Sequence, residues 1–292
     1  MKIKRVIYSI YVDVPVEEHY GKSKHIRDTQ KKAQITVDAF KKHYNKLIEV
    51  KRKYANSIDA SFLMFEYNKQ YQTYKKLLLQ KCPELTGYEI VNFYKIHLLY
   101  KLAKDYDEIL YLDFDAIPTT KESFFNAWDL SKGICVYNNN AMINKKDRPI
   151  NEIEYGIRSP SGKYFNCQAM LIATGHNPKN DVINTGIIGA RKEDIFKLDF
   201  FGDFKGTLSL MTKLRNEKND MYPQNIINMF RYDNETIFSY KIEINNVNIQ
   251  WLDNQWHYFF DKQYFIPKET KLVHAVCKKF DIVWRYYEKY NI

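Results

Sequence analysis

The stretch Ile109-Leu110-Tyr111-Leu112-Asp113-Phe114-Asp115 decides how this chain is expected to fold. Its short run of bulky apolar residues is typical of a strand that is covered on both faces in a parallel sheet. Two carboxylates follow this run directly, and a buried charge is costly unless it is paired or bound to a cation. We therefore expect Asp113 and Asp115 at the carboxyl edge of the sheet, where open α/β folds bind ligands. If the strand continues regularly, both acids leave on one side and Phe114 on the other.

This pair of acids has two interpretations on spacing alone. Carboxylate oxygens placed in this way suit Mg²⁺ or Mn²⁺ bound together with a diphosphate. An Asp-x-Asp pair also occurs in turns and helix caps, and Pro118, Thr119 and Thr120 follow closely. The spacing by itself leaves both interpretations open.

The composition is typical of a globular protein, and the charge favours an acidic partner. Its 292 residues are 45% hydrophobic and 27% charged, enough for one large α/β domain or two small ones. The net charge of +10 favours nucleotide phosphates, nucleic acid or anionic lipid as partners. A genome bias toward Lys, Asn, Ile and Tyr explains the same excess and hints at an AT-rich genome, such as that of a large virus or a bacterium.

The N-terminal sequence has no signal-peptide pattern, and no apolar run approaches the length of a membrane-spanning helix. A cytoplasmic location is the expectation, and for a viral protein this is the host cytoplasm.

Strand and helix patterns alternate along most of the chain, which predicts an α/β fold with mainly parallel strands. Strands are predicted at 6–12, 61–65, 109–112, 133–137 and 182–190. Helices are predicted at 28–44, 68–81, 89–105, 121–129, 191–198, 207–217 and 224–230. Residues 138–166 are predicted to form a long irregular loop. The aromatic and basic residues 280–290 are predicted to form a helix that docks on the domain, with contact to an anionic membrane or a nucleic-acid strand as alternatives.

Several motifs occur together in one order along the chain. They are Phe93-Tyr94-Lys95, the strand ending in Asp113-Phe114-Asp115, Asn184-Thr185-Gly186, Pro223-Gln224-Asn225-Ile226-Ile227-Asn228, Trp251-Leu252-Asp253-Asn254-Gln255-Trp256-His257, and finally His274 with Lys279. With these motifs the chain resembles the GT-A-fold glycosyltransferases, most closely the family-8 type that includes glycogenin and bacterial galactosyl- and glucosyltransferases. The resemblance covers about residues 1–280. The chain departs from the family pattern at Pro223, where the family has Asp, at Cys277, where it has Gly, and in lacking the final Pro-Trp.

The resemblance implies a fold and an activity. The fold is a Rossmann-like GT-A sandwich, with a central, mostly parallel mixed sheet flanked by helices. It implies one domain over 1–292, with 275–292 as a C-terminal aromatic and basic extension. The activity is transfer of a sugar from a nucleotide-sugar donor, usually UDP-linked, to a glycan or another hydroxyl acceptor. Mn²⁺ or Mg²⁺ is the implied cofactor, and retention of configuration at the sugar is the implied outcome.

The resemblance also implies roles for individual residues. Asp113, Asp115 and His274 hold the metal, with Asp113 also at the donor. Lys95 and Lys279 are placed at the donor's sugar or diphosphate, and Gly186 also lies at the donor. Asn184 and Gln224 are catalytic residues in the sugar pocket. Tyr11 and Asp13 lie at the base. A glutamine is a poor nucleophile, so Gln224 is expected to position the sugar while the acceptor hydroxyl attacks from the front.

Simpler interpretations remain for most of these residues. Lys95 beside an apolar helical stripe is often a surface lysine whose stem covers apolar area. A lone histidine such as His274 is often an ordinary packed residue. Turn or helix-start roles explain the others, namely Asn184, Gln224, Tyr11 and Asp13.

Two other classes of function use the same residues. One is a basic nucleic-acid-binding protein or metal-dependent nuclease, although no recognisable nucleic-acid module is found and no nucleic-acid partner is expected. The other is a degenerate transferase fold that serves in binding. The sequence does not name the sugar, the acceptor, the linkage or the oligomeric state.

Overall fold

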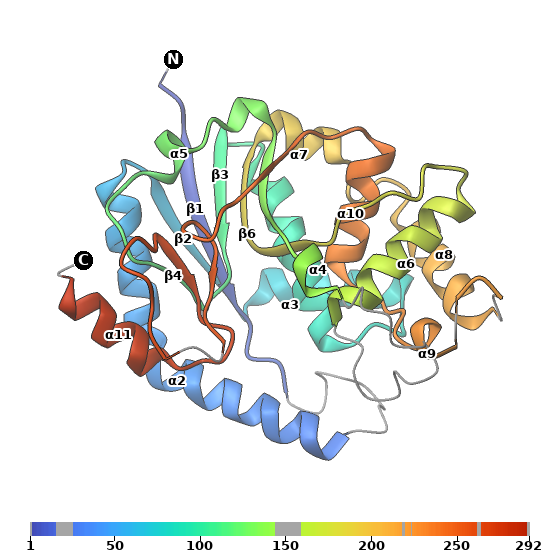
Figure 1. Ribbon diagram of the computed structural model, residues 1–292, viewed down its shortest axis with the longest axis horizontal. Coiled ribbons are helices and arrows are strands. Elements are labelled where there is room, and N and C mark those ends of the chain that lie inside the picture. The colour runs from blue at the N-terminus through green and yellow to red at the C-terminus, as the bar shows by residue number, and fades with distance from the viewer. Residues whose placement is uncertain are drawn as a thin grey trace.

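The computed structural model describes residues 2–15, 26–143, 159–217, 220–222, 224–261 and 264–290. At its centre lies a six-stranded sheet with the order β2-β1-β3-β6-β5-β7 (Figure 1). The strands are β1 (Arg5–Tyr11), β2 (Ser61–Glu66), β3 (Glu108–Leu112), β5 (Ile134–Asn138), β6 (Ile183–Arg191) and β7 (Ile249–Trp251).

Most neighbours in this sheet are parallel. Strand β1 pairs in parallel with β2 and β3, and β5 pairs in parallel with β7. Strand β6 runs antiparallel to both of its neighbours, β3 and β5. The predicted α/β class with a mostly parallel mixed sheet is therefore confirmed.

Helices cover both faces of this sheet (Figure 1). They are α2 (Ile26–Ser57), α3 (Lys69–Lys81), α4 (Gly87–Leu102), α5 (Phe124–Ala127), α6 (Ser159–Ala173), α7 (Lys192–Leu198), α8 (Phe204–Asn216), α9 (Gln224–Ile227), α10 (Asn234–Ile244) and α11 (Phe280–Lys289). Helix α10 contacts α6, α4 and β6, whereas α2 contacts β1, β2 and the short strand β4 (Ala116–Pro118).

Alternation along β3 explains why both faces need a cover. Ile109 and Tyr111 are buried in the core on the α4 and α10 side. Leu110 and Leu112 are buried in a second core on the opposite face. Since successive side chains of a strand point to opposite faces, an uninterrupted apolar run fits a strand buried on both.

A smaller sheet completes the side of the molecule that carries α2 and α11. It has the order β4-β9-β8, with β8 at Tyr258–Phe259 and β9 at Leu272–His274. Helix α11 buries Phe280, Val283 and Trp284 in a core that also contains Leu47 of α2. The predicted C-terminal helix is thus present, and its apolar face is covered by the protein itself.

Two local predictions were wrong, and one helix was not predicted. The loop predicted at 138–166 gives way to α6 at Ser159, although residues 144–158 lie outside the described part. The helix predicted at 28–44 continues to Ser57. Helix α10 was not predicted, because its residues 234–242 are buried all round and show no amphipathic stripe.

Within the residues that the structure describes, no helix combines the length and the apolar composition needed to cross a membrane.

Candidate active site

The two acids lie at the end of β3, in a turn. The Ala116 amide donates to the Asp113 carbonyl at 2.8 Å, and the Asp113 amide donates to the Gly186 carbonyl at 2.7 Å. The strand therefore does not continue regularly through the two acids, which was the condition for sorting their side chains. The two carboxylates nevertheless lie on one side, as expected, because both approach His274. Phe114 is buried and stacks on Tyr11, with 4.9 Å between ring centroids.

His274 joins these acids from the other end of the chain. Its Nε2 lies 3.6 Å from Asp115 Oδ2 and 3.8 Å from Asp113 Oδ2. One donor atom from each of the three residues lies within 4.8 Å of the others. A Cβ atom at Gly186 would stand 2.4 Å from His274 Cε1, so a residue without a side chain is needed behind the imidazole ring.

This donor set fits a divalent cation. Two carboxylates and one imidazole suit Mn²⁺, and the carboxylates suit Mg²⁺ as well. Asp115 and His274 are buried, while the Asp113 side chain is 27% exposed and borders the open cleft. The exposed side leaves room for oxygen ligands from a substrate, since both ions commonly share phosphate oxygens with the protein.

A second histidine holds His274 in place. His257 is fully buried, and its Nε2 lies 2.9 Å from His274 Nδ1. Its ring stacks on Phe259 with centroids 4.6 Å apart. Burial lowers the pKa of His257 well below its ordinary value, and the neighbouring His274 lowers it further, so this imidazole is neutral. The contact at Nδ1 turns His274 Nε2 toward the acids, as outer partners of metal-binding histidines do.

Lysines surround the acids. Lys278 forms an ion pair with Asp115. Burial alone would raise the pKa of Asp115, but Lys278 and His274 outweigh it and hold that pKa well below the usual range. Lys95 Nζ lies 3.5 Å from Asp113 Oδ1 and 3.2 Å from the Thr185 carbonyl oxygen.

Another lysine supports the turn from behind. The fully buried Lys51 donates to the Phe114 carbonyl at 2.8 Å. Burial lowers the pKa of Lys51 to about 7, although Asp115 and Asp113 act in the opposite direction. Lys51 thus fixes the turn without facing the cleft.

The acids open into a cleft of about 800 Å³. One end is formed by the end of β1 and by α2, with Tyr11, Asp13 and Phe40. The opposite end is formed by the start of α10, where Asn234 and Glu235 line the wall. The cleft therefore runs from an aromatic end, past the acids, to a polar end.

A second charged cluster forms that polar end. Glu235 accepts hydrogen bonds from the Thr185 amide at 2.9 Å and the Thr185 hydroxyl at 3.2 Å, and it forms an ion pair with Lys163. Asn234 Nδ2 donates to the Thr185 hydroxyl oxygen at 2.7 Å. Asp233 caps α10 by accepting from the amides of Glu235 and Thr236, which fixes the helix start at the cleft.

Most of the predicted site residues meet in this cleft. Those that line it are Tyr11, Asp13, Lys95, Asp113, Asp115, Asn184 and His274. Lys95 is buried, so its interpretation as a surface lysine was wrong. Gly186 lies directly behind His274.

Two predicted residues are placed elsewhere. Gln224 is exposed, and its amide donates to Asn228 Oδ1 at 3.0 Å. Pro223, which was expected to open that helix, lies outside the described residues. The exposed Lys279 lies over the Tyr264 ring, 5.6 Å from its centroid, and Lys278 lines the cleft in its stead.

The residues that the sequence did not single out are Lys278, His257, Lys163, Asn234 and Glu235. Two sequence signals touched them: His257 ends the motif that begins at Trp251, although no role was given to it, and the acid-rich stretch Asp233-Asn234-Glu235 is typical of a helix N-cap.

The chain was compared with known proteins. No family model and no curated protein matches it. Among solved structures it is similar to a glycosyltransferase involved in the glycosylation of the major capsid of PBCV-1, with 14% identity over 99% of this chain and 100% of that one, at a TM-score of 0.45. It is also similar to mouse xyloside xylosyltransferase 1, with 10% identity over 94% of this chain and 99% of that one, at a TM-score of 0.43.

A third similar structure is the galactosyltransferase LgtC in complex with donor and acceptor sugar analogues. It shares 10% identity over 97% of this chain and 94% of that one, at a TM-score of 0.43. All three are glycosyltransferases, the class that the sequence resembles. Similarity of this size does not transfer an activity from these proteins to this chain.

Proposed function

We propose that this protein is a GT-A-type glycosyltransferase that uses a divalent cation, Mn²⁺ or Mg²⁺, and a nucleotide-sugar donor, most simply a UDP-sugar. The observation that carries the proposal is the convergence of Asp113, Asp115 and His274 on one wall of a large cleft. The two acids are 159 residues or more from His274 in the chain, so the fold brings this donor set together (274 − 115 = 159). The whole described chain serves as one catalytic domain in this proposal.

The cleft offers a place for each part of such a donor. A bound cation neutralises charge on the diphosphate leaving group. Lys278 reaches the same point, and in releasing Asp115 it can turn its ammonium to a phosphate oxygen. The aromatic end with Tyr11 and Phe40 suits the base, which stacks on aromatic rings.

The polar end then takes the sugar. Asn184 Oδ1 is held by the Gly186 amide at 2.9 Å, which orients its amide nitrogen. Asn234 and Glu235 are fixed by Thr185. These rigid groups suit sugar hydroxyls, because hydrogen bonds from fixed groups cost little reorganisation.

The transfer itself breaks the bond between the anomeric carbon and the diphosphate oxygen, whose electron pair leaves with the nucleotide. The acceptor oxygen forms the new bond to that carbon, and its proton passes to the departing phosphate oxygen. Retention follows if this attack occurs on the face that the nucleotide leaves. Gln224 is exposed, so the structure lends its predicted positioning role no support.

Metal-dependent hydrolysis of donors tests this proposal. Wild-type protein is incubated with UDP-glucose, UDP-galactose, UDP-xylose and UDP-N-acetylglucosamine, with Mn²⁺ or with a chelator, and nucleotide release is measured. We expect release with at least one donor, dependent on Mn²⁺ and absent in Asp115→Asn. Exposed Asp105→Ala serves as the matched control. Binding of UDP without any turnover would instead support a degenerate transferase that only binds.

A further inference from the structure

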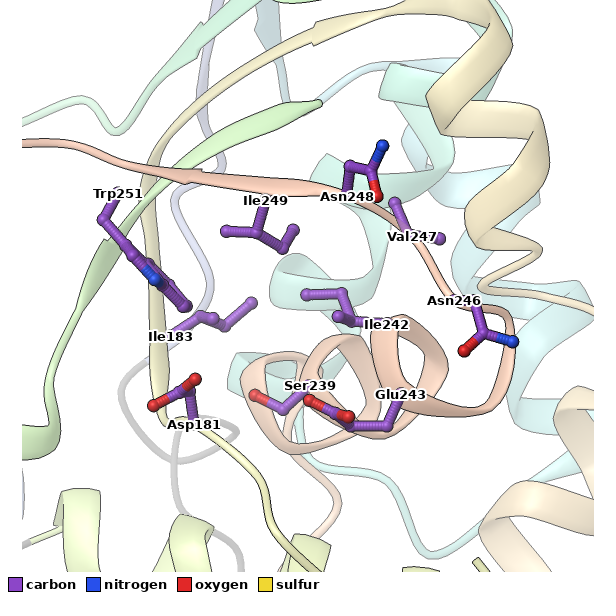
Figure 2. A pocket seen from close by; sticks show the side chains of 10 residues that line it. All are labelled: Asp181, Ile183, Ser239, Ile242, Glu243, Asn246, Val247, Asn248, Ile249 and Trp251. Atoms are coloured by element: carbon purple, nitrogen blue, oxygen red, sulfur yellow. The ribbon is translucent and has the colours of Figure 1, made fainter. Parts of the chain in front are cut away.

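A second, smaller pocket lies apart from the active-site cleft. It has a volume of about 370 Å³ and is walled by the start of β6, by the second half of α10 and by β7 (Figure 2). Ile183 lines this pocket, whereas its neighbour Asn184 lines the cleft. Both hollows also border α10, the cleft at Glu235 and this pocket at Ser239 and Glu243.

The floor of this pocket is apolar and its edge is aromatic. Ile183, Ile242 and Val247 are buried, and Ile183, Ile242 and Ile249 lie between Trp251 and α10 in Figure 2. Trp251 is 39% exposed, although tryptophan is a residue whose large apolar ring is normally covered. A floor and an exposed ring of this kind offer apolar contact to a ligand.

Polar groups complete the rim. The Asp181 carboxylate accepts from Asn138 Nδ2 at 3.2 Å and also from Asn140, which holds it in one orientation. Glu243 stands opposite on α10, and burial together with the charge of Asp181 raises the pKa of its carboxyl.

Ser239 supplies a hydroxyl. This residue lines the pocket, and its hydroxyl lies on the side of α10 that faces Asp181 in Figure 2. A hydroxyl in this place can both donate to a ligand and accept from one.

The chemistry of the lining selects the kind of ligand. Two carboxylates disfavour phosphates and other anions by like-charge repulsion. A purely apolar ligand would cover these carboxylates without hydrogen bonds, which is costly. A pyranose satisfies both parts of the lining, because its C–H face can lie on the indole while its hydroxyls donate to fixed carboxylates.

We propose that the pocket of Ser239, Glu243, Asp181 and Trp251 binds one sugar unit of the acceptor glycan. This inference rests on the proposed transferase function and adds a docking point for the acceptor. Helix α10 connects the two sites, since Glu235 in the cleft precedes Ser239 by ~6 Å and Glu243 by ~12 Å along the helix axis. An oligosaccharide can span such a distance.

Saturation-transfer NMR tests the pocket with the full chain. The probes are methyl glycosides of glucose, galactose, mannose, xylose and N-acetylglucosamine. At least one is expected to receive saturation from the wild-type protein. Trp251→Ala and Glu243→Gln are each expected to weaken that binding by about tenfold or more, and Trp251→Phe is expected to retain part of it. Tyr67→Ala, another exposed aromatic, and Glu217→Gln are the matched controls.

A cleft variant separates this proposal from the proposed function. Asp113→Ala is expected to lose binding of UDP with Mn²⁺ but to keep the glycoside signal. A glycoside signal that survives Trp251→Ala and Glu243→Gln, in variants that are still folded, would overturn the pocket assignment. Binding of methylammonium, a cation that the two carboxylates could attract, without binding of any glycoside would overturn it as well. No glycoside binding to a wild-type protein that hydrolyses a UDP-sugar would also overturn it, and would leave the transferase function standing.

Discussion

Two charged clusters border the cleft, and they differ in how their carboxylates are arranged. At the start of α10, the oxygens of Glu235 are taken up by Thr185 and Lys163. At the end of β3, Asp113 and Asp115 approach each other and a histidine, with one side open to the cleft. In the first, closed cluster the glutamate is held by a threonine and a lysine, whereas the second, open cluster brings two carboxylates and an imidazole within 4.8 Å of one another beside their lysine partners. Burial and charge alone therefore do not identify a metal site, but several ligand atoms that converge at a cleft do.

Removing an acid from the open cluster gives the largest expected effect. We expect Asp113→Ala and Asp115→Ala each to lower metal-dependent UDP-sugar hydrolysis by more than about 100-fold, because each removes a ligand rather than an outer partner. Thermal unfolding should shift little, since Lys278 can turn to solvent in Asp115→Ala and Lys95 keeps the Thr185 carbonyl as its partner in Asp113→Ala. Nucleotide release and the melting temperature are measured on the same samples. Hydrolysis at the wild-type rate in either variant would refute the metal role.

The closed cluster should respond in the opposite way. Glu235→Ala removes the carboxylate that pairs with the partly buried Lys163 and that accepts from the buried Thr185 amide, and leaving such a buried group unpaired costs ~1–3 kcal/mol of unfolding free energy. Urea unfolding measures this loss, with Glu217→Ala at an exposed position as control. A loss below about 1 kcal/mol would show that the two clusters are not different in kind.

His257 acts on the open cluster indirectly, through its contact with His274. His257→Phe keeps a ring to stack on Phe259 but removes the contact to His274 Nδ1. We expect a ~10–100-fold weaker Mn²⁺ affinity with the nucleotide-free protein, measured by isothermal titration calorimetry. His257→Gln, which can still contact His274, should recover part of that affinity. Equal Mn²⁺ affinity in wild type and His257→Phe would exclude the positioning role.

Lys51 is expected to act on the pH dependence of stability. Its folded pKa of about 7 lies below the unfolded value of ~10.4, so the unfolded chain binds the extra proton between these values. The free energy of unfolding should therefore rise with pH from about 7 to 10, by up to ~1.4 kcal/mol per pH unit from this group.

Urea unfolding with EDTA at several pH values checks this slope, and Lys51→Met should flatten it. An unchanged slope in that variant would show that Lys51 keeps its proton throughout.

The sequence predicted the parts of the site that local patterns determine. The apolar run before Asp113 identified β3, and its position before two acids indicated the edge of the sheet. The helix with Lys95 was recognisable by its apolar stripe. His274 and Asn184 were found only through the order of motifs along the chain.

The other parts depend on tertiary structure. Lys278 adopts a left-handed φ of 58° at a turn, and this turn directs it, and not Lys279, into the cleft. His257 meets His274 only because β8 and β9 pair. Helix α6 begins at Ser159 and has Pro160 in its first turn, a residue that indicated a loop in the sequence but is tolerated there.

The most direct test of the cation site at Asp113, Asp115 and His274 is Mn²⁺ binding followed by electron paramagnetic resonance. Bound Mn²⁺ loses the sharp signal of the free ion in this measurement. Wild-type protein with UDP is predicted to remove one equivalent of free Mn²⁺, and Asp113→Ala with UDP is predicted to remove none. Asp105→Ala should behave as wild type. If Mn²⁺ stays free in the presence of wild-type protein and UDP, or if Asp113→Ala binds it equally well, then the open cluster is not a cation site.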